Sequence, residues 1–262
     1  MTRSRNADLA RAALVVCALV ACALSLVLAA APARAQQTLG LAVGDTLELT
    51  RGELRGLAWL DDGTAVALVA ASTADSVGAD GPVTLQWLAP GGAVIREHDV
   101  TGMLSRGLAF DGKWFWSLGD ASAERPATLY KIESDTLFVA EEYPTPGHRP
   151  RDLAWADDGL WLVDRDRGRL DRFDPETEEV TRSYATPAFS PTGVAGDGRD
   201  LWISDLATGL IYRLNSGGTR WTGTVAASDW FSRGQELQLH WRDGSLLVTP
   251  AGTGRIIRAR PE

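Results

Sequence analysis

Five related five-residue phrases recur along this chain at intervals of 41 to 51 residues. They read RGLAW, RGLAF, RDLAW, TGVAG and LQLHW, and they begin at Arg55, Arg106, Arg151, Thr192 and Leu237. Self-similarity with this period, built from short apolar runs, is typical of β-propellers, in which each repeat forms one four-stranded blade around a central channel. We therefore predict an all-β fold with one blade per phrase.

The third repeat shows the plan of a blade most clearly. After RDLAW, short apolar runs bounded by Asp-Gly, Gly and Pro predict strands at 160–164, 169–174 and 179–186. The same pattern predicts strands at 106–110, 114–118, 128–133 and 137–143 in the second repeat, and at 192–196, 201–205, 209–215 and 221–226 in the fourth. The first repeat has strands at 55–59, 64–71, 83–89 and 93–100, with an inserted loop at 72–81.

The fifth repeat contains only three predicted strands, at 237–241, 245–249 and 255–260. A fourth is available upstream of the first phrase, at Thr46 to Thr50. We expect this N-terminal strand to join the C-terminal blade, because closing the ring removes exposed sheet edges. The prediction is a five-bladed β-propeller, and six blades is the alternative if 72–81 or 228–235 contains further strands.

The first 35 residues have the features of a signal peptide. Arg3, Arg5 and Arg11 precede an apolar run from Ala12 to about Ala31, and Ala33-Arg34-Ala35 fits a cleavage site. Two alternatives are a lipoprotein anchored at Cys22 and an uncleaved membrane anchor. We therefore expect an exported protein, periplasmic or extracellular, in which residues 36–262 form a single propeller domain without a membrane span.

Composition restricts the chemistry of that domain. Both cysteines, Cys17 and Cys22, lie in the signal run, so the remaining 227 residues have neither a disulfide nor a thiolate nucleophile or zinc ligand. The net charge of the whole chain is −8, and residues 1–35 carry four arginines and one aspartate, so the mature chain carries −11. This negative charge argues against nucleic acid as a partner. We also expect the protein to be a monomer.

Residues 45–262 resemble the secreted bacterial propellers with NHL-like, streptogramin-lyase-like and gluconolactonase-like repeats. The resemblance is carried by RDLAWADDGLWLVDRDRGRLDRFDPET (151–177) and PTGVAGDGRDLWISDLATGLIYRLN (191–215). It implies the blade and a ligand at one mouth of the channel. These segments consist of turn and packing residues, so the resemblance implies no particular chemistry.

Enzymes of this group use residues that this chain does not reproduce. Streptogramin-lyase-like proteins use histidine and glutamate close together on neighbouring strands, whereas His98, His148 and His240 occur in no His-x-Glu or Glu-x-His pairing. Gluconolactonase-like proteins bind a cation with asparagines, and Asn215 is the only asparagine after the signal. Plant-type glutaminyl cyclotransferases are five-bladed, but 64–71 has no carboxylate where that family places its catalytic acid. A hydrolase, lactonase or glutaminyl-cyclotransferase-like enzyme acting at the channel stays an alternative, with unknown catalytic residues.

The candidate site lies at the first strands, which line the channel of a propeller. Arg55, Arg106 and Arg151 occupy the same position in three consecutive blades, with Thr192 and Leu237 completing the circuit. Converging guanidinium groups suit a carboxylate or phosphate. The competing interpretation is that each arginine pairs with a neighbouring acid, for which Asp152 and Glu236 are available. We predict a module that binds a small, anionic ligand or a protein partner, with no cofactor.

Two further features have structural and functional interpretations. His240 replaces the alanine found in the other four phrases, and it is either part of the ligand site or a hydrogen-bonded structural histidine. Asp164 and Asp166, followed by Gly168, resemble part of a Ca²⁺ loop but lack the remaining ligands, so binding of turn amides is the alternative. A third interpretation of the fold is a scaffold whose loops at 72–81 and 121–126 dock a partner.

Overall fold

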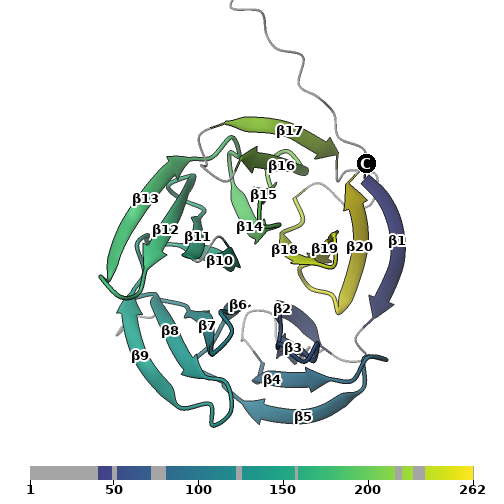
Figure 1. The fold of residues 1–262 in the computed structure, drawn as a ribbon, viewed down its shortest axis with the longest axis vertical. Helices are drawn as coiled ribbons and strands as arrows, with labels where there is room; N and C mark the ends of the chain where they lie inside the picture. Colours follow the sequence, from purple (N-terminus) through teal and green to yellow (C-terminus); the bar gives the residue numbers. More distant parts are fainter. Residues whose placement is uncertain are drawn as a thin grey trace, which may run out of the picture. The chain divides into compact units, whose positions relative to one another are not determined.

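Within the part of the chain that the structure describes, twenty strands form five antiparallel sheets of four strands each (Figure 1). The structure, a computed structural model, describes residues 41–48, 52–71, 81–121, 126–156, 159–215, 220–226 and 234–261. The innermost strands β2, β6, β10, β14 and β18 follow one another around the centre, each in contact with the next. The predicted five-bladed β-propeller is confirmed.

The blades are numbered by the phrase that opens them. Blade 1 contains β2 (Glu53–Trp59), β3 (Ala65–Ala70), β4 (Val83–Leu88) and β5 (Val94–Asp99). Blade 2 contains β6 (Arg106–Phe110), β7 (Trp114–Gly119), β8 (Thr128–Glu133) and β9 (Val139–Pro144). Blade 3 contains β10 (Pro150–Ala156), β11 (Gly159–Asp164), β12 (Arg169–Asp174) and β13 (Glu179–Ala185). Blade 4 contains β14 (Pro191–Gly196), β15 (Asp200–Asp205), β16 (Leu210–Asn215) and β17 (Trp221–Ala226).

Blade 5 combines strands from both ends of the sequence. It has the order β18 (Leu237–Arg242), β19 (Ser245–Pro250), β20 (Arg255–Pro261) and β1 (Leu41–Glu48), and β1 pairs antiparallel with β20. The strand expected at Thr46 to Thr50 thus begins earlier, at Leu41, and ends at Glu48. That this strand holds the ring closed stays a prediction, which truncation can test.

The start of the outer strand of blade 2 also differs from the prediction, as do several other strand ends by one or two residues. The outer strand of blade 2 was expected from Leu137, but β9 begins at Val139. Leu137 has a φ of 60° and its N–H donates to the carbonyl of Glu133, so it belongs to the preceding turn. Residues 1–35, where a signal peptide is expected, most of the 72–81 loop and residues 122–125 and 227–233 lie outside the described residues. No helix in the described part of the chain is long and apolar enough to cross a bilayer.

The core is built from small and large residues that face each other across the first two strands. Ala109, Ala154 and Ala195, at position 4 of their phrases, pair with Trp116, Trp161 and Trp202 of the second strands. All three tryptophans are at most 1% exposed. In blade 2 the register makes Trp116, and not the adjacent Phe115, the residue equivalent to Trp161 and Trp202.

The same tryptophans fasten the turns of two blades. Asp111 accepts a hydrogen bond from Trp116 Nε1 (2.8 Å) and two from turn amides, and Asp197 does the same for Trp202 Nε1 (3.1 Å). A buried indole N–H needs a partner, so one carboxylate serves both the turn and the core. Trp116 and Trp202 therefore have a structural role in their blades.

Candidate functional site

The predicted arginines lie together at one end of the first strands. Arg55, Arg106 and Arg151 line a cavity of about 210 Å³. Its other lining residues are Glu53, Thr192, Glu236, Gln238 and Ala251. The structure therefore brings position 1 of four phrases to one place, which we call the arginine cavity.

An irregularity of the backbone shapes this end of each blade. The pairing of the first two strands shifts register at Leu54/Gly56, Arg106/Leu108, Pro150/Asp152 and Pro191/Gly193. In blade 5 the corresponding pairing of β18 with β19 has no shift. Such bulges re-aim side chains at the rims of sheets, so the arginine cavity forms where four of the five first strands depart from regular pairing.

Each cavity arginine has an acidic partner. Arg106 makes a bidentate contact with Asp120, Nε to Oδ1 at 2.9 Å and Nη2 to Oδ2 at 2.7 Å. Arg55 lies 3.5 Å from Glu53, and Arg151 donates to Glu236.

Glu236 joins two blades at the rim of the cavity. Besides Arg151 it accepts from Arg165 Nη1, at 2.6 Å. The ion pairs predicted by the competing interpretation therefore exist for all three arginines, and Glu236 takes the role expected of it.

The charges of the cavity influence one another. Burial, followed by the nearby charge of Arg106, lowers the pKa of Arg151, and Glu236 opposes this shift. Burial raises the pKa of Asp120, but the hydrogen bond and charge of Arg106 outweigh it, so the net shift is downward. Two guanidinium groups of neighbouring blades are thus close enough to repel each other.

Two buried polar atoms of residues that line the cavity have no hydrogen-bond partner among the described residues. They are Nε of Arg151, a donor, and Oε1 of Gln238, an acceptor. Buried polar groups are normally satisfied by protein, water or ligand. An occupant of the cavity would therefore have to accept a hydrogen bond from Arg151 Nε and donate one to Gln238 Oε1.

Asp152 has a role different from the ion pair for which it was considered. It is fully buried, and its carboxylate accepts hydrogen bonds from the backbone N–H groups of Leu153 (2.9 Å) and Val194 (3.1 Å) and from the backbone of Leu239. Burial raises its pKa to about 7 against the effect of these amides. Asp152 therefore connects blades 3, 4 and 5 beneath the arginine cavity.

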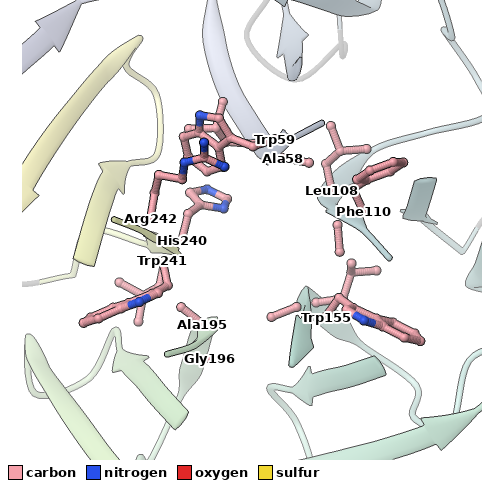
Figure 2. A pocket seen from close by; sticks show the side chains of 15 residues that line it. Ala58, Trp59, Leu108, Phe110, Trp155, Ala195, Gly196, His240, Trp241 and Arg242 are labelled. Atoms are coloured by element: carbon pink, nitrogen blue, oxygen red, sulfur yellow. The ribbon is translucent and has the colours of Figure 1, made fainter. Parts of the chain in front are cut away.

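His240 lies at the other end of the first strands. It lines a second cavity of about 180 Å³ with the residues at positions 3 to 5 of the phrases (Figure 2). The sequence grouped His240 with the arginines in one ligand site, but the structure places it in a separate cavity. Thr192 does lie at the arginine cavity, where its hydroxyl is 3.0 Å from Ser204 Oγ and 3.3 Å from the carbonyl of Leu237.

The two aspartates considered for Ca²⁺ have protein partners. Asp164 is buried and accepts from the backbone N–H groups of Arg149 (2.9 Å) and Arg167 (2.8 Å), whereas Asp166 is exposed and lies 3.6 Å from Arg149. The described residues contain no group of three or more His, Cys, Asp or Glu that could hold a metal ion. Asp164 thus binds the amides of a turn, as the alternative interpretation expected.

The sequence missed several residues of the arginine cavity and its surroundings. Glu53, Gln238 and the ion-pair partners Arg165 and Asp120 were not predicted. Gln238 had a visible signal, since it stands at position 2, where three of the other phrases have glycine and one has aspartate.

Comparison with known proteins supports the fold. No family model matches the sequence, and no curated protein is similar to it in sequence. Among solved structures, the chain is similar to glutaminyl cyclase of Myxococcus xanthus, with a TM-score of 0.66 and 12% identity over 86% of this chain and 97% of that chain. The chain has a β-propeller fold related to that of this cyclase.

Two lyase structures give weaker matches. Virginiamycin B lyase of Staphylococcus aureus has a TM-score of 0.47 and 12% identity over 84% of this chain and 99% of that chain. A streptogramin B lyase has a TM-score of 0.48 and 13% identity over 88% and 100%. At 12% identity the match to the cyclase shows the fold alone and carries no activity to this chain.

Proposed function

We propose that this protein is a binding module that takes a small carboxylate- or phosphate-bearing molecule into the arginine cavity. The observation that carries the proposal is the convergence of three arginines from consecutive blades on one cavity that also holds two unpartnered buried polar atoms. Guanidinium groups offer several N–H donors in a plane and suit both anions.

The ion pairs within the cavity limit the charge of the ligand that it can bind. Its lining holds three arginines and two glutamates, so it retains one net positive charge in a chain of net charge −8. A small anion of low charge fits this balance better than a polyanion, which the rest of the surface would repel. The ligand's anionic oxygen would accept from Arg151 Nε, and an adjacent hydroxyl or amino group would donate to Gln238 Oε1.

A thermal-shift experiment tests the proposal. Acetate, lactate, malate and phosphate would be compared with chloride at equal ionic strength, on the parent chain and on Arg106→Gln and Arg151→Gln variants. Arg242→Gln is the matched control, because it removes one positive charge at the other end of the first strands. We expect at least one of the first four anions to raise Tm in the parent and the control, with little effect in the two cavity variants.

Two results would contradict the proposal. One is a parent protein whose Tm is the same in all these salts. The other is a shift that is equally large in Arg106→Gln and Arg151→Gln, which would place the bound anion elsewhere. Export of the chain, expected from residues 1–35, is a separate proposal, tested by N-terminal sequencing of the secreted protein.

A further inference from the structure

The cavity at the other end of the first strands differs in chemistry from the arginine cavity. Its walls are mainly small and aliphatic side chains at positions 3 and 4 of the phrases, and its lining holds Arg242 but no carboxylate among the described residues. Figure 2 shows the rings of Trp155 and Trp241 directed away from the middle of the cavity, toward the blades. Trp241 stacks on the buried Trp202, with centroids 6.0 Å apart.

His240 is the one phrase residue that brings a polar side chain into the layer of alanines. It pairs across the strands with Leu247, where blades 2 to 4 have tryptophan, so blade 5 has room for a larger side chain at this position. The ring lies against Trp59 in an edge-to-face arrangement, with centroids 6.5 Å apart. The histidine therefore fills space that the smaller Leu247 leaves.

The hydrogen bonding of His240 leaves one nitrogen for an occupant. The ring hydrogen-bonds to the backbone of Leu57, and this bond favours the protonated ring, so the histidine is the donor. Nε2 is buried and has no partner in the part of the chain that the structure describes, which leaves Nδ1 as the nitrogen that donates to Leu57. Burial keeps the ring neutral by lowering its pKa to about 3. In this state Nε2 carries a lone pair and can only accept a hydrogen bond.

We propose that this cavity, which we call the histidine cavity, binds a small uncharged molecule rich in hydroxyl groups, a polyol or a monosaccharide, that donates one hydroxyl to His240 Nε2. Carboxylates and phosphate dianions bring no donor for this nitrogen. A cation would meet Arg242 without a compensating carboxylate in the lining.

The backbone around the cavity also suits hydroxyl groups. The first strand of each blade is an edge strand of its sheet and pairs with a single partner strand. Its other edge therefore turns N–H and C=O groups toward the channel, and hydroxyls can both accept from and donate to such groups. The volume of about 180 Å³ exceeds that of several water molecules.

This proposal does not rest on the proposed function, because the two cavities use different residues at opposite ends of the first strands. Saturation-transfer NMR with glycerol, myo-inositol, D-xylose and D-glucose would find the best probe, which is then titrated. We expect the dissociation constant to rise about tenfold or more in His240→Ala, the residue of the other four phrases, because the acceptor is lost. His240→Gln, which keeps a side-chain acceptor, should retain part of the affinity, and Arg106→Gln should bind like the parent.

A second measurement observes His240 itself in the parent protein. In protein labelled with ¹⁵N-histidine, the Nε2 resonance of His240, assigned by its loss in His240→Ala, should move when the probe is added, while those of His98 and His148 stay fixed. The proposal is overturned if none of the four probes receives saturation, if His240→Ala binds as tightly as the parent, or if binding leaves the Nε2 resonance unchanged. If acetamide binds to the histidine cavity and no polyol does, the proposed class of ligand is wrong.

Discussion

Two buried titratable side chains are expected to make opposite contributions to the pH dependence of this propeller's stability. Burial raises the pKa of Asp152 from 3.8 to about 7 and lowers that of His240 from 6.5 to about 3. Between about pH 4 and 6.5, the folded chain holds a proton on Asp152 that the unfolded chain has released. In the same range the unfolded chain holds a proton on His240 that the folded chain does not bind.

The two effects have opposite signs. The contribution of Asp152 to the free energy of unfolding is fully present below pH 3.8 and is lost as the pH rises through 7, because the folded state binds the proton more tightly. The contribution of His240 is fully present above pH 6.5 and is lost as the pH falls through 3. The shifts correspond to about 4 kcal/mol for Asp152 and about 5 kcal/mol for His240, each with a slope of about 1.4 kcal/mol per pH unit.

We therefore expect the two slopes to cancel in the parent and to appear in single variants. In Asp152→Asn only the histidine term remains, so the free energy of unfolding should rise by about 2 kcal/mol from pH 4.5 to 6, relative to the parent. In His240→Ala it should fall by a similar amount. The double variant should regain the pH dependence of the parent.

Urea unfolding of the four proteins at several pH values between 4.5 and 6 measures these slopes. Lost packing or a mismatched amide lowers stability by an amount independent of pH, and other carboxylates titrate alike in all four proteins, so both cancel in the comparison. If Asp152→Asn keeps the slope of the parent, the three amide hydrogen bonds outweigh burial and Asp152 is ionised throughout. That result would refute the assignment of the buried proton.

Three further predictions concern the scaffold. Trp202→Ala should lower the free energy of unfolding by about 3–5 kcal/mol, because a fully buried aromatic is removed, whereas Phe189→Ala at an 81% exposed side chain should have little effect in the same denaturation assay. Gly56→Ala should destabilise by about 1–3 kcal/mol, since its Cβ would lie 2.7 Å from the backbone nitrogen of Leu108, while Gly91→Ala, with open space around it, should be neutral. Deletion of residues 1–48 should lower Tm and promote aggregation by exposing the edge of β20, as measured by calorimetry and light scattering, whereas deletion of residues 1–35 should do neither.

The blades were predictable because each one repeats the same local chemistry. Asp-Gly turns and short apolar runs set the strands, and five phrases set the number of blades. What a single repeat could not reveal was pairing between blades. The partners Arg165 and Glu236 lie 71 residues apart, and the amides that bind Asp152 come from blades 3, 4 and 5. Such contacts depend on how the first strands of neighbouring blades are aligned. An alignment of the repeats with one another does not show this.

The separation of His240 from the arginines could have been inferred from the phrases themselves. Positions 1 and 4 are three residues apart, which is about 10 Å along a strand. Comparing phrases by column identifies which residues depart from the repeat, and counting along the strand then assigns each departure to an end of the channel. The arginines at position 1 offer donors to an anion, while the histidine at position 4 offers an acceptor to a hydroxyl group, so the two proposed ligands differ in charge and in the group that the protein would bind.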